Sequence, residues 1–539
     1  MPISLVQPGE RPGHGPVELE TRDLKPEIRN KSELMGMGEW KDGQAQSIFA
    51  GCEQLRPSQH RGGSRKAEVF GGLLPEQRSW IRLLLGALAL VGLAVQLEAA
   101  AAAAPKKPNI LIILTDDQGR GDYSAFGTRD IRTPNMDRLF REGITFDNFF
   151  ANSCVCSPSR ASLLTGCYPD RVGVPGVIRE ECPRDSWGYL ARNAVLLPEL
   201  LKPAGYHTAI VGKWHLGINS PNTPTERGFD FFQGFLGDMM DDYWTHLRNG
   251  YNFLRRDQEV VNPKGHATDV FTDWACEYLE ERAKAHQPFF LYLAYNAPHD
   301  PIQPPPEWLA KVKQREPGLS EKRARLVALI EHLDEGMGKV LGTLDRLGLA
   351  EGTLVIFNSD NGGVLANEAN NGPWRSGKQH MYEGGLRVPG AARWPGRIRP
   401  GSRTERMTLT MDVFATVCEA AGAAPPAGID GVSFLPVLLG KAEPEPKRDL
   451  YFVRREGGND YGGNTINALR RGNWKLLQDS PFAPLELYNL LEDPQEKTEL
   501  ARQEGKVFNE LSAALREQIQ RAGAVPWQPE ERQFDPFRH

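Results

Sequence analysis

Four mainly apolar runs, set apart by helical patterns, dominate the arrangement of hydrophobic and polar positions along this chain. They span residues 109–114, 207–211, 289–295 and 353–357. Their residues do not alternate between apolar and polar, as those of a strand with one solvated face do. Apolar strands alternating with helices are typical of an α/β domain with a buried sheet. We therefore expect a large mixed, mostly parallel sheet flanked by helices, over residues 105–440.

The pattern changes after a stretch rich in proline and glutamate at 441–447, which we interpret as a linker. Short strand-like runs follow at 450–454, 467–471 and 474–477, with Gly-Asn pairs between them. An amphipathic pattern closes the region at about 499–521. These features predict a C-terminal α+β subdomain over 441–539, with a small antiparallel sheet and a helix.

The first hundred residues contain two further segments. Residues 1–75 are polar and without sustained periodicity, which predicts disorder, and we expect the natural start of the protein near residue 75. In 76–104, Arg78 and Arg82 precede an apolar run at 83–95 and an alanine-rich exit, the pattern of a signal peptide. A membrane anchor is the alternative, but the run is shorter than the roughly 20 residues of a spanning helix. We expect export to the periplasm or the exterior, with membrane contact only during export.

The composition of the chain bears on its binding partners and on its disulfides. Lys and Arg total 64 against 69 Asp and Glu, a net charge of −5, and no long basic run occurs, which argues against nucleic-acid binding. The seven cysteines are too few for a disulfide scaffold at this length. Cys167 and Cys182 could form a disulfide in an exported protein or remain two thiols.

Oxygen-bearing side chains follow two of the four apolar runs. Asp116 and Asp117 come after the first run, and Asp360 and Asn361 after the fourth. Ligands bind beyond the carboxyl ends of parallel strands, and adjacent buried carboxylates repel each other unless a cation lies between them. Each group alone could be a solvated turn. Together they predict a site for Ca²⁺, with Mg²⁺ less suited.

Cationic and titratable side chains follow the other two runs. Lys213 and His215 come after the second run, and we expect them to share one face of an extended segment. His299 follows the third run, and Lys378 lies in a later glycine-rich stretch. A fixed positive charge beside a histidine suits proton transfer near neutral pH. Each of these residues taken alone is a weak signal.

The stretch from Cys156 to Arg160 combines a thiol, two hydroxyl groups and a guanidinium group. We expect a helix here, with Ser157 at the N-cap, Pro158 at the first helical position and Gly166 at the end. The N-terminus of such a helix presents free N–H groups that suit an anion. The same five residues would also suit an ordinary helix cap beside a cysteine that has only a structural role.

The stretch continues to Leu164-Thr165-Gly166 and resembles, at every fixed position, the sulfatase signature Cys-x-Pro-Ser-Arg-x-x-x-Leu-Thr-Gly. Gly-Lys-Trp-His-Leu-Gly at 212–217 and Ala-Pro-His at 297–299 resemble further blocks of that family in the expected order. The chain is thus similar to the type I sulfatases of the alkaline-phosphatase-like superfamily over roughly residues 107–500. The resemblance implies a sulfuric ester hydrolase that converts a sulfate ester into sulfate and alcohol.

The resemblance also implies the parts of the site. In that family a formylglycine-generating enzyme oxidises the signature cysteine, here Cys156, and the hydrated aldehyde of the resulting formylglycine attacks sulfur. One Ca²⁺ is held by carboxylate and amide oxygens and by the modified cysteine. The implied metal ligands are Asp116, Asp117, Cys156, Asp360 and Asn361. The implied catalytic residues are Cys156, Arg160, Lys213, His215, His299 and Lys378, with Asp360 taking the proton of the attacking hydroxyl group.

Two other functions stay open. A phosphatase or phosphonate hydrolase of the same superfamily would need carboxylates for a second metal where this chain has Lys213, His215 and Lys378. A catalytically silent carbohydrate-binding protein would not need the acid–base groups. The substrate is not readable, although the cluster at 241–244 (Asp-Asp-Tyr-Trp) suits sugar stacking as well as packing. A sulfated saccharide is preferred over an aryl sulfate.

Overall fold

The four apolar runs form adjacent parallel strands of one ten-stranded sheet. The computed structural model describes residues 107–179, 188–457 and 463–523, so the predicted disordered segment and signal peptide lie outside the described residues. The four strands are β1 (Asn109–Thr115), β4 (His207–Lys213), β10 (Phe289–Ala294) and β11 (Thr353–Ser359). The other six are β2 (Ile144–Phe146), β5 (Phe231–Phe235), β8 (Leu254–Arg256), β9 (Glu259–Val260), β12 (Gly390–Arg393) and β13 (Ser402–Thr404).

Strand β1 lies at the centre of the sheet, with the order β13–β2–β12–β11–β1–β10–β4–β5–β8–β9. Ile112 of β1 pairs with Tyr292 on β10 and Ile356 on β11, and all three side chains are buried. Strands β12 and β8 run antiparallel to their neighbours β11 and β5. The predicted fold class, a mixed and mostly parallel sheet, is confirmed, and its apolar runs reflect burial on both faces.

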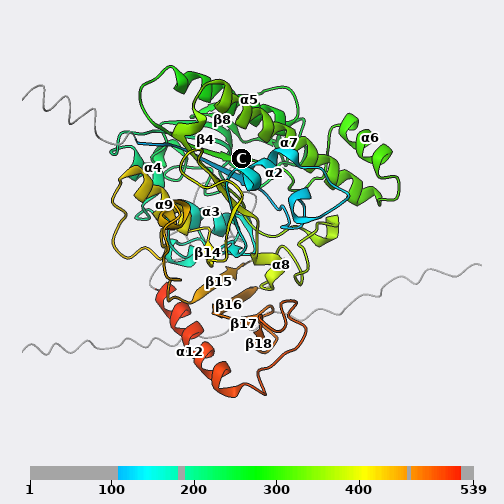
Figure 1. The fold of residues 1–539 in the computed structure, drawn as a ribbon, viewed down its shortest axis with the longest axis vertical. Coiled ribbons are helices and arrows are strands. Elements are labelled where there is room, and N and C mark those ends of the chain that lie inside the picture. Colours follow the sequence, from blue (N-terminus) through cyan, green and yellow to red (C-terminus); the bar gives the residue numbers. More distant parts are fainter. Residues whose placement is uncertain (1–106, 180–187, 458–462, 524–539) are drawn as a thin grey trace, which may run out of the picture. The chain divides into compact units, whose positions relative to one another are not determined.

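Helices cover both faces of the sheet (Figure 1). One group packs together as α2 (Pro134–Glu142), α5 (Ala267–Ala283), α6 (Pro306–Arg315) and α7 (Glu321–Arg346). The second group is α3 (Cys156–Thr165), α4 (Leu197–Leu201), α9 (Asp412–Ala421) and α10 (Leu435–Leu438). Short 3-10 helices are η1 (Ser124–Phe126), η2 (Pro169–Val172), η3 (Thr225–Arg227), η4 (Ala350–Gly352) and η5 (Leu365–Asn367). In the described residues no helix is long and apolar enough to cross a membrane.

The C-terminal region forms a four-stranded antiparallel sheet with one helix, as predicted. Its elements are β15 (Leu450–Arg455), β16 (Thr465–Arg471), β17 (Trp474–Gln478), β18 (Glu486–Asn489) and α12 (Gly505–Ala522). Helix α12 packs on β16 and β17 and begins six residues later than the amphipathic pattern suggests. The reason is local: Glu499 Oε1 accepts a hydrogen bond from Leu487 N, and Leu500 N donates to the Leu487 carbonyl, so both residues are tied to β18.

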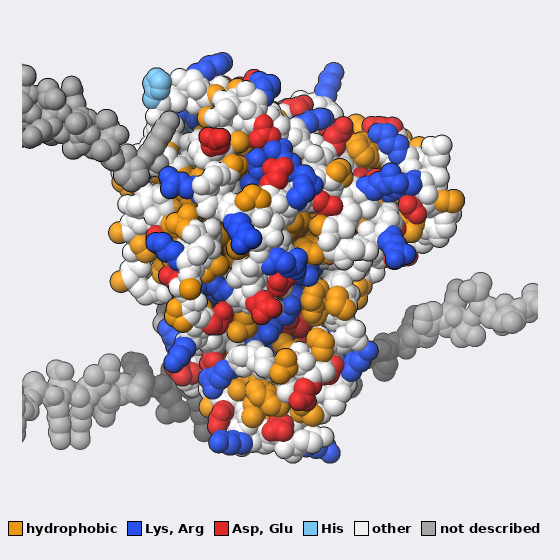
Figure 2. Space-filling view, in the orientation of Figure 1, with side chains coloured by type: hydrophobic (Ala, Val, Ile, Leu, Met, Phe, Trp, Pro, Cys, Tyr) orange, Lys and Arg blue, Asp and Glu red, His pale blue; other side chains and the backbone are white. Residues whose placement is uncertain are grey.

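Further short elements lie outside these two sheets. They are β3 (Phe149–Phe150), β14 (Thr408–Leu409), β6 (Leu247–Arg248), β7 (Tyr251–Asn252) and α8 (Glu383–Leu386). Between α8 and the small sheet lies a buried ionic cluster: Lys475 Nζ is 3.0 Å from Glu383 Oε1 and 2.8 Å from Glu496 Oε1. On the surface, acidic and basic side chains are interspersed over the face shown in Figure 2.

Candidate active site

The ends of β1 and β11 bring four oxygen-bearing side chains together. Asp116 and Asp117 directly follow β1, while Asp360 and Asn361 directly follow β11, and all four are buried. Asp117 N donates to Asp360 Oδ1 (3.1 Å), and Asn361 Nδ2 donates to Asp117 Oδ1 (2.7 Å). The parallel pairing of the two strands therefore places both groups at one edge of the sheet.

Three cationic side chains surround these carboxylates. Lys213 Nζ lies 2.6 Å from Asp116 Oδ2, and Arg160 Nη2 lies 3.2 Å from the same oxygen and 2.8 Å from Asp360 Oδ2. Lys378 Nζ lies 2.7 Å from Asp117 Oδ2. Arg160 and Lys213 are fully buried, so these ion pairs are little screened by solvent.

The two carboxylates that Arg160 contacts differ in protonation state. Burial alone would raise the pKa of Asp116, but Lys213, His299 and Arg160 hold that pKa well below its usual range. Burial and the charge of Asp116 raise the pKa of Asp360 to about 7, although Arg160 opposes this. Like charges in one dry site push two pKa values apart, so Asp116 is ionised while Asp360 can exchange a proton near neutrality.

Two oxygen atoms of these four side chains indicate a binding site for a cation. Asp116 Oδ1 and Asn361 Oδ1 are buried and have no hydrogen-bond partner, an arrangement that is costly unless something else is bound there. Potential ligand atoms of Asp116, Asp117, Cys156 and His299 lie within 4.8 Å of one another. Carboxylate and amide oxygens are the ligands that Ca²⁺ prefers. The donor set thus fits the predicted cation.

Helix α3 begins at Cys156, with Val155 at its N-cap. The prediction that Ser157 is the N-cap and Pro158 the first helical position is therefore wrong: the helix starts earlier, and Pro158 lies within its first turn. The predicted end is confirmed, because Gly166 follows the helix with φ 70° and its N–H closes the last turn. Cys156 is 3% exposed, so the thiol is inside the site rather than on its rim.

The hydroxyl groups of the signature stretch hold neighbouring loops instead of capping the helix. Ser157 Oγ accepts a hydrogen bond from Ile178 N (3.1 Å). Ser159 Oγ accepts from Ser153 N (3.2 Å) and donates to the Ser153 carbonyl (3.1 Å). Both serines are buried. The stretch therefore fixes the loops on either side of Cys156, a role that capping preferences did not indicate.

His215 is a neutral base with a defined tautomer. Strand β4 ends at Lys213 and His215 has φ 58°, so the two do not belong to one extended segment as expected. His215 Nε2 is 2.9 Å from the Ile178 carbonyl, which can only accept, so Nε2 carries the proton. Nδ1 is buried without a partner. Burial and the charge of Lys213 hold the pKa of His215 well below its usual value.

His299 also has a defined tautomer. Its Nδ1 donates to the Asp300 carbonyl (2.8 Å), so its Nε2 accepts from Lys378 Nζ (3.0 Å). The same Nε2 is 3.5 Å from Asp117 Oδ2. Burial and the charge of Lys378 lower the pKa of His299. The structure thus brings all the predicted site residues to one edge of the sheet.

Strand β15 of the C-terminal sheet contacts three loops of this site, which sequence reasoning missed. The Val453 carbonyl accepts from Ser153 Oγ (2.8 Å), and Arg455 N donates to the Pro175 carbonyl (2.8 Å). Arg454 Nη1 donates to the carbonyl of Gln379, next to Lys378 (3.1 Å). Most of these partners are backbone atoms, for which the sequence carries no signal.

The two aromatic residues of the cluster at 241–244 differ in solvent exposure. Tyr243 is 1% exposed and cannot stack on a substrate, so packing, one of the two roles that the sequence left open, holds for this residue. Trp244 is 46% exposed. Asp242 accepts hydrogen bonds from the backbone N–H groups of Trp244 and Thr245 and so shapes the turn. Cys182, the possible disulfide partner of Cys167, lies outside the described residues.

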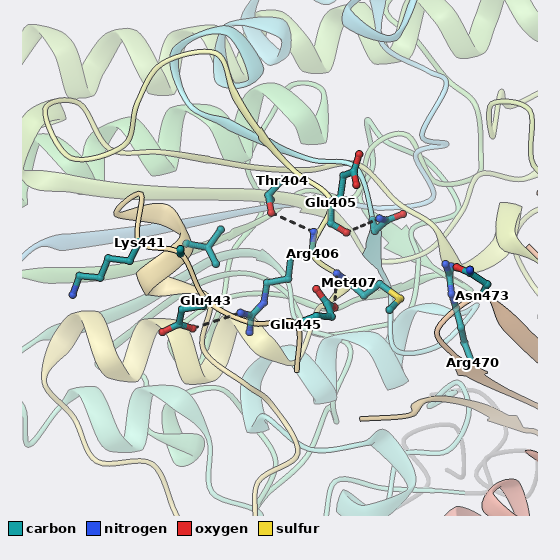
Figure 3. A pocket seen from close by; sticks show the side chains of 12 residues that line it. Thr404, Glu405, Arg406, Met407, Lys441, Glu443, Glu445, Arg470 and Asn473 are labelled. Carbon is teal, nitrogen blue, oxygen red and sulfur yellow. Dashed lines mark hydrogen bonds and ion pairs between the residues drawn. The ribbon is translucent and has the colours of Figure 1, made fainter. Parts of the chain in front are cut away.

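A surface crevice of about 510 Å³ lies apart from these groups, between the segment 404–407, the linker and the β16–β17 turn (Figure 3). Two of its carboxylates have partners within the crevice: Arg406 Nη1 is 3.7 Å from Glu443 Oε2, and Met407 N donates to Glu445 Oε1 (3.0 Å). It contains none of the predicted site residues.

Comparisons with known proteins agree with this geometry. The family model described as Sulfatase matches residues 108–423, and the model N-sulphoglucosamine sulphohydrolase, C-terminal, matches 374–524. The N-acetylgalactosamine-6-sulfatase of Canis lupus familiaris is 36% identical, over 70% of this chain and 72% of that protein. The N-acetylgalactosamine-6-O-sulfatase of Bacteroides thetaiotaomicron is 29% identical, over 76% and 93%. The crystal structure of Ps i-CgsB in complex with k-i-k-neocarrahexaose has a TM-score of 0.69 and 29% identity, over 80% and 95%.

Proposed function

This chain belongs to the sulfatase family and is a sulfuric ester hydrolase, and from that premise we propose that it removes 6-O-sulfate from a hexosamine of a sulfated saccharide. The names of relatives from a mammal and a bacterium support this substrate class. The buried carboxylate–lysine–arginine cluster at the ends of β1 and β11 carries the proposal, because it is built to hold an anion beside a cation.

We propose that Asp116, Asp117, Asp360 and Asn361 hold one Ca²⁺. The unpartnered buried oxygens of Asp116 and Asn361 support this assignment. When bound, the cation supplies positive charge that withdraws electron density from the sulfate oxygens. Arg160 and Lys213 then neutralise the remaining carboxylate charge and offer N–H donors to the sulfate group.

Cys156 is the proposed source of formylglycine, and a formylglycine-generating enzyme the proposed partner during maturation. Burial raises the pKa of the Cys156 thiol to about 12, although Lys213 and Lys378 oppose this. The unmodified thiol is thus protonated at neutral pH and a poor nucleophile. Oxidation would convert the thiol-bearing carbon into an aldehyde, and the hydrate of that aldehyde has two hydroxyl groups. One hydroxyl group would attack sulfur, and deprotonation of the other would release sulfate.

The remaining residues move protons. Asp360, whose carboxylate Arg160 also contacts, takes the proton from the attacking hydroxyl group. His215 accepts the second proton at Nδ1, the ring nitrogen without a partner. Because His299 Nε2 is unprotonated, Lys378 donates the proton to the departing alcohol, and His299 holds the ammonium group in place.

Export to the periplasm or exterior also stays a proposal, supported by the pattern at 76–104. The catalytic part of the proposal is tested with a panel of sulfated monosaccharides, an aryl sulfate and the matching aryl phosphate, using enzyme made with its modifying enzyme. We expect sulfate release, fastest from N-acetylgalactosamine 6-sulfate. Faster cleavage of the phosphate would point to the phosphatase alternative, and equal rates on 4- and 6-sulfates would contradict the substrate class.

A further inference from the structure

A buried tyrosine that the mechanism does not use holds the turn that carries His299. Tyr243 Oη donates to the carbonyl of His299 (2.9 Å) and lies 3.0 Å from the carbonyl of Asn296. The same turn is closed by a hydrogen bond from His299 N to the Asn296 carbonyl (3.0 Å). One hydroxyl group thus contacts both ends of the turn.

Tyr243 is itself fixed from three directions. Its N–H donates to Gln303 Oε1 (2.9 Å), and its carbonyl accepts from Ala267 N (2.8 Å). Its ring stacks on His266, with 4.9 Å between ring centroids and 26° between planes. A side chain held this firmly can determine where its hydrogen-bond partner lies.

His266, which supports the ring, belongs to a group with Asp269 and His332 whose ligand atoms lie within 4.8 Å of one another. Both nitrogens of His266 are nevertheless occupied. Nδ1 accepts from Thr268 N (3.2 Å), and Nε2 donates to the Gln303 carbonyl (2.9 Å). His266 is therefore the N-cap of α5 and a platform for Tyr243, and the group does not offer three free metal ligands.

The opposite side of the turn contacts the proposed metal site. Asp116 N donates to the Ala297 carbonyl (3.2 Å), so the turn lies between Asp116 and Tyr243. We propose that Tyr243 is a positioning residue: its hydroxyl group fixes the turn so that His299 Nε2 stays within hydrogen-bond distance of Lys378 Nζ. This inference rests on the proposed function of His299 and Lys378.

The variant Tyr243→Phe removes the hydroxyl group and keeps the stacked ring. We expect a roughly tenfold fall in kcat with KM changed by less than about twofold, because small misplacements of an acid–base group slow the chemical step. The fall in kcat should be greater for a saccharide sulfate than for an activated aryl sulfate, whose leaving group needs less protonation.

The matched control is Tyr206→Phe. Tyr206 is equally buried, and its hydroxyl group also donates to a backbone carbonyl, that of Pro108 (2.8 Å), at the opposite edge of the sheet. It should lower stability to a similar extent and leave kcat unchanged. Equal losses of kcat in both variants would overturn the inference, since they would show a general effect of stability.

A double-mutant cycle with His299→Ala tests whether Tyr243 acts through His299. We expect Tyr243→Phe to have no further effect on kcat once His299 is alanine; the same fall in both backgrounds would overturn the proposal. A crystal structure of Tyr243→Phe gives an answer independent of activity. The distance from His299 Nε2 to Lys378 Nζ should lengthen, and an unchanged turn would refute positioning. Failure of the wild type to cleave any sulfate would instead refute the proposed function alone.

Discussion

The buried ionic cluster between α8 and the C-terminal sheet makes a strong prediction for Lys475→Met. The Lys475 ammonium group is fully buried between Glu383 and Glu496. Methionine keeps a side chain of similar length but carries no charge. Removing one partner from a buried ion pair leaves uncompensated charge and typically costs about 3–5 kcal/mol. Because Lys475 faces two carboxylates, we expect a loss near the upper end of that range at neutral pH.

The loss should depend on pH. Burial alone would raise the pKa of Glu383, but Lys475, Arg470 and Arg387 hold it well below its usual range. The stabilisation from this carboxylate is therefore present above about pH 4.3, the usual pKa of glutamate, and disappears as the pH falls through the lower folded-state pKa. Burial raises the pKa of Glu496. In the variant, Glu496 gains a proton more readily, so the destabilisation should shrink from neutral to mildly acidic pH.

Guanidinium denaturation of the wild type and Lys475→Met, at neutral and mildly acidic pH, measures both effects. The double variant Lys475→Met/Glu496→Gln is the control. It removes the Glu496 carboxylate, which loses its Lys475 partner, whereas Glu383 keeps its ion pairs with Arg387 and Arg470, so part of the lost stability should be recovered. A destabilisation below about 1 kcal/mol, or one independent of pH, would refute the reasoning.

Three further variants test the site. Gly176→Ala would place Cβ 2.0 Å from the Arg455 carbonyl oxygen, so the loop that carries the hydrogen-bond acceptor of His215 must move, and kcat should fall at least about tenfold in steady-state assays. Asn361→Ala should weaken Ca²⁺ binding by calorimetry and lower activity at limiting calcium; unchanged affinity would remove Asn361 from the metal site. Cys156→Ala should be inactive yet folded and still able to bind calcium, whereas residual turnover would show another nucleophile.

Much of the fold was readable because its strands are buried on both faces. The runs at 109–114 and 353–357 have few polar residues to obscure them, and they become the adjacent strands β1 and β11. The residues after them were predicted to meet because parallel strands end at one edge. The burial that produces the sequence signal is thus also what places Asp116, Asp117, Asp360 and Asn361 together.

The errors arise where tertiary contacts outweigh local preferences. Ser157 is a good N-cap by type, yet its hydroxyl group bonds to Ile178, so the helix starts at Cys156 instead. Tyr243 is compatible in sequence with sugar stacking and with packing, and its hydrogen bonds to two backbone carbonyls, 53 and 56 residues away, decide for packing. Backbone partners leave no trace in composition or periodicity, so these roles could not be predicted.

The central claim is that this sulfatase works through an oxidised Cys156, and mass spectrometry of the peptide containing that residue tests it most directly. Protein made with a formylglycine-generating enzyme should contain an aldehyde in place of the thiol, and its specific activity on a sulfate ester should rise in proportion to the oxidised fraction. Full activity in protein whose Cys156 remains entirely a thiol would contradict the account.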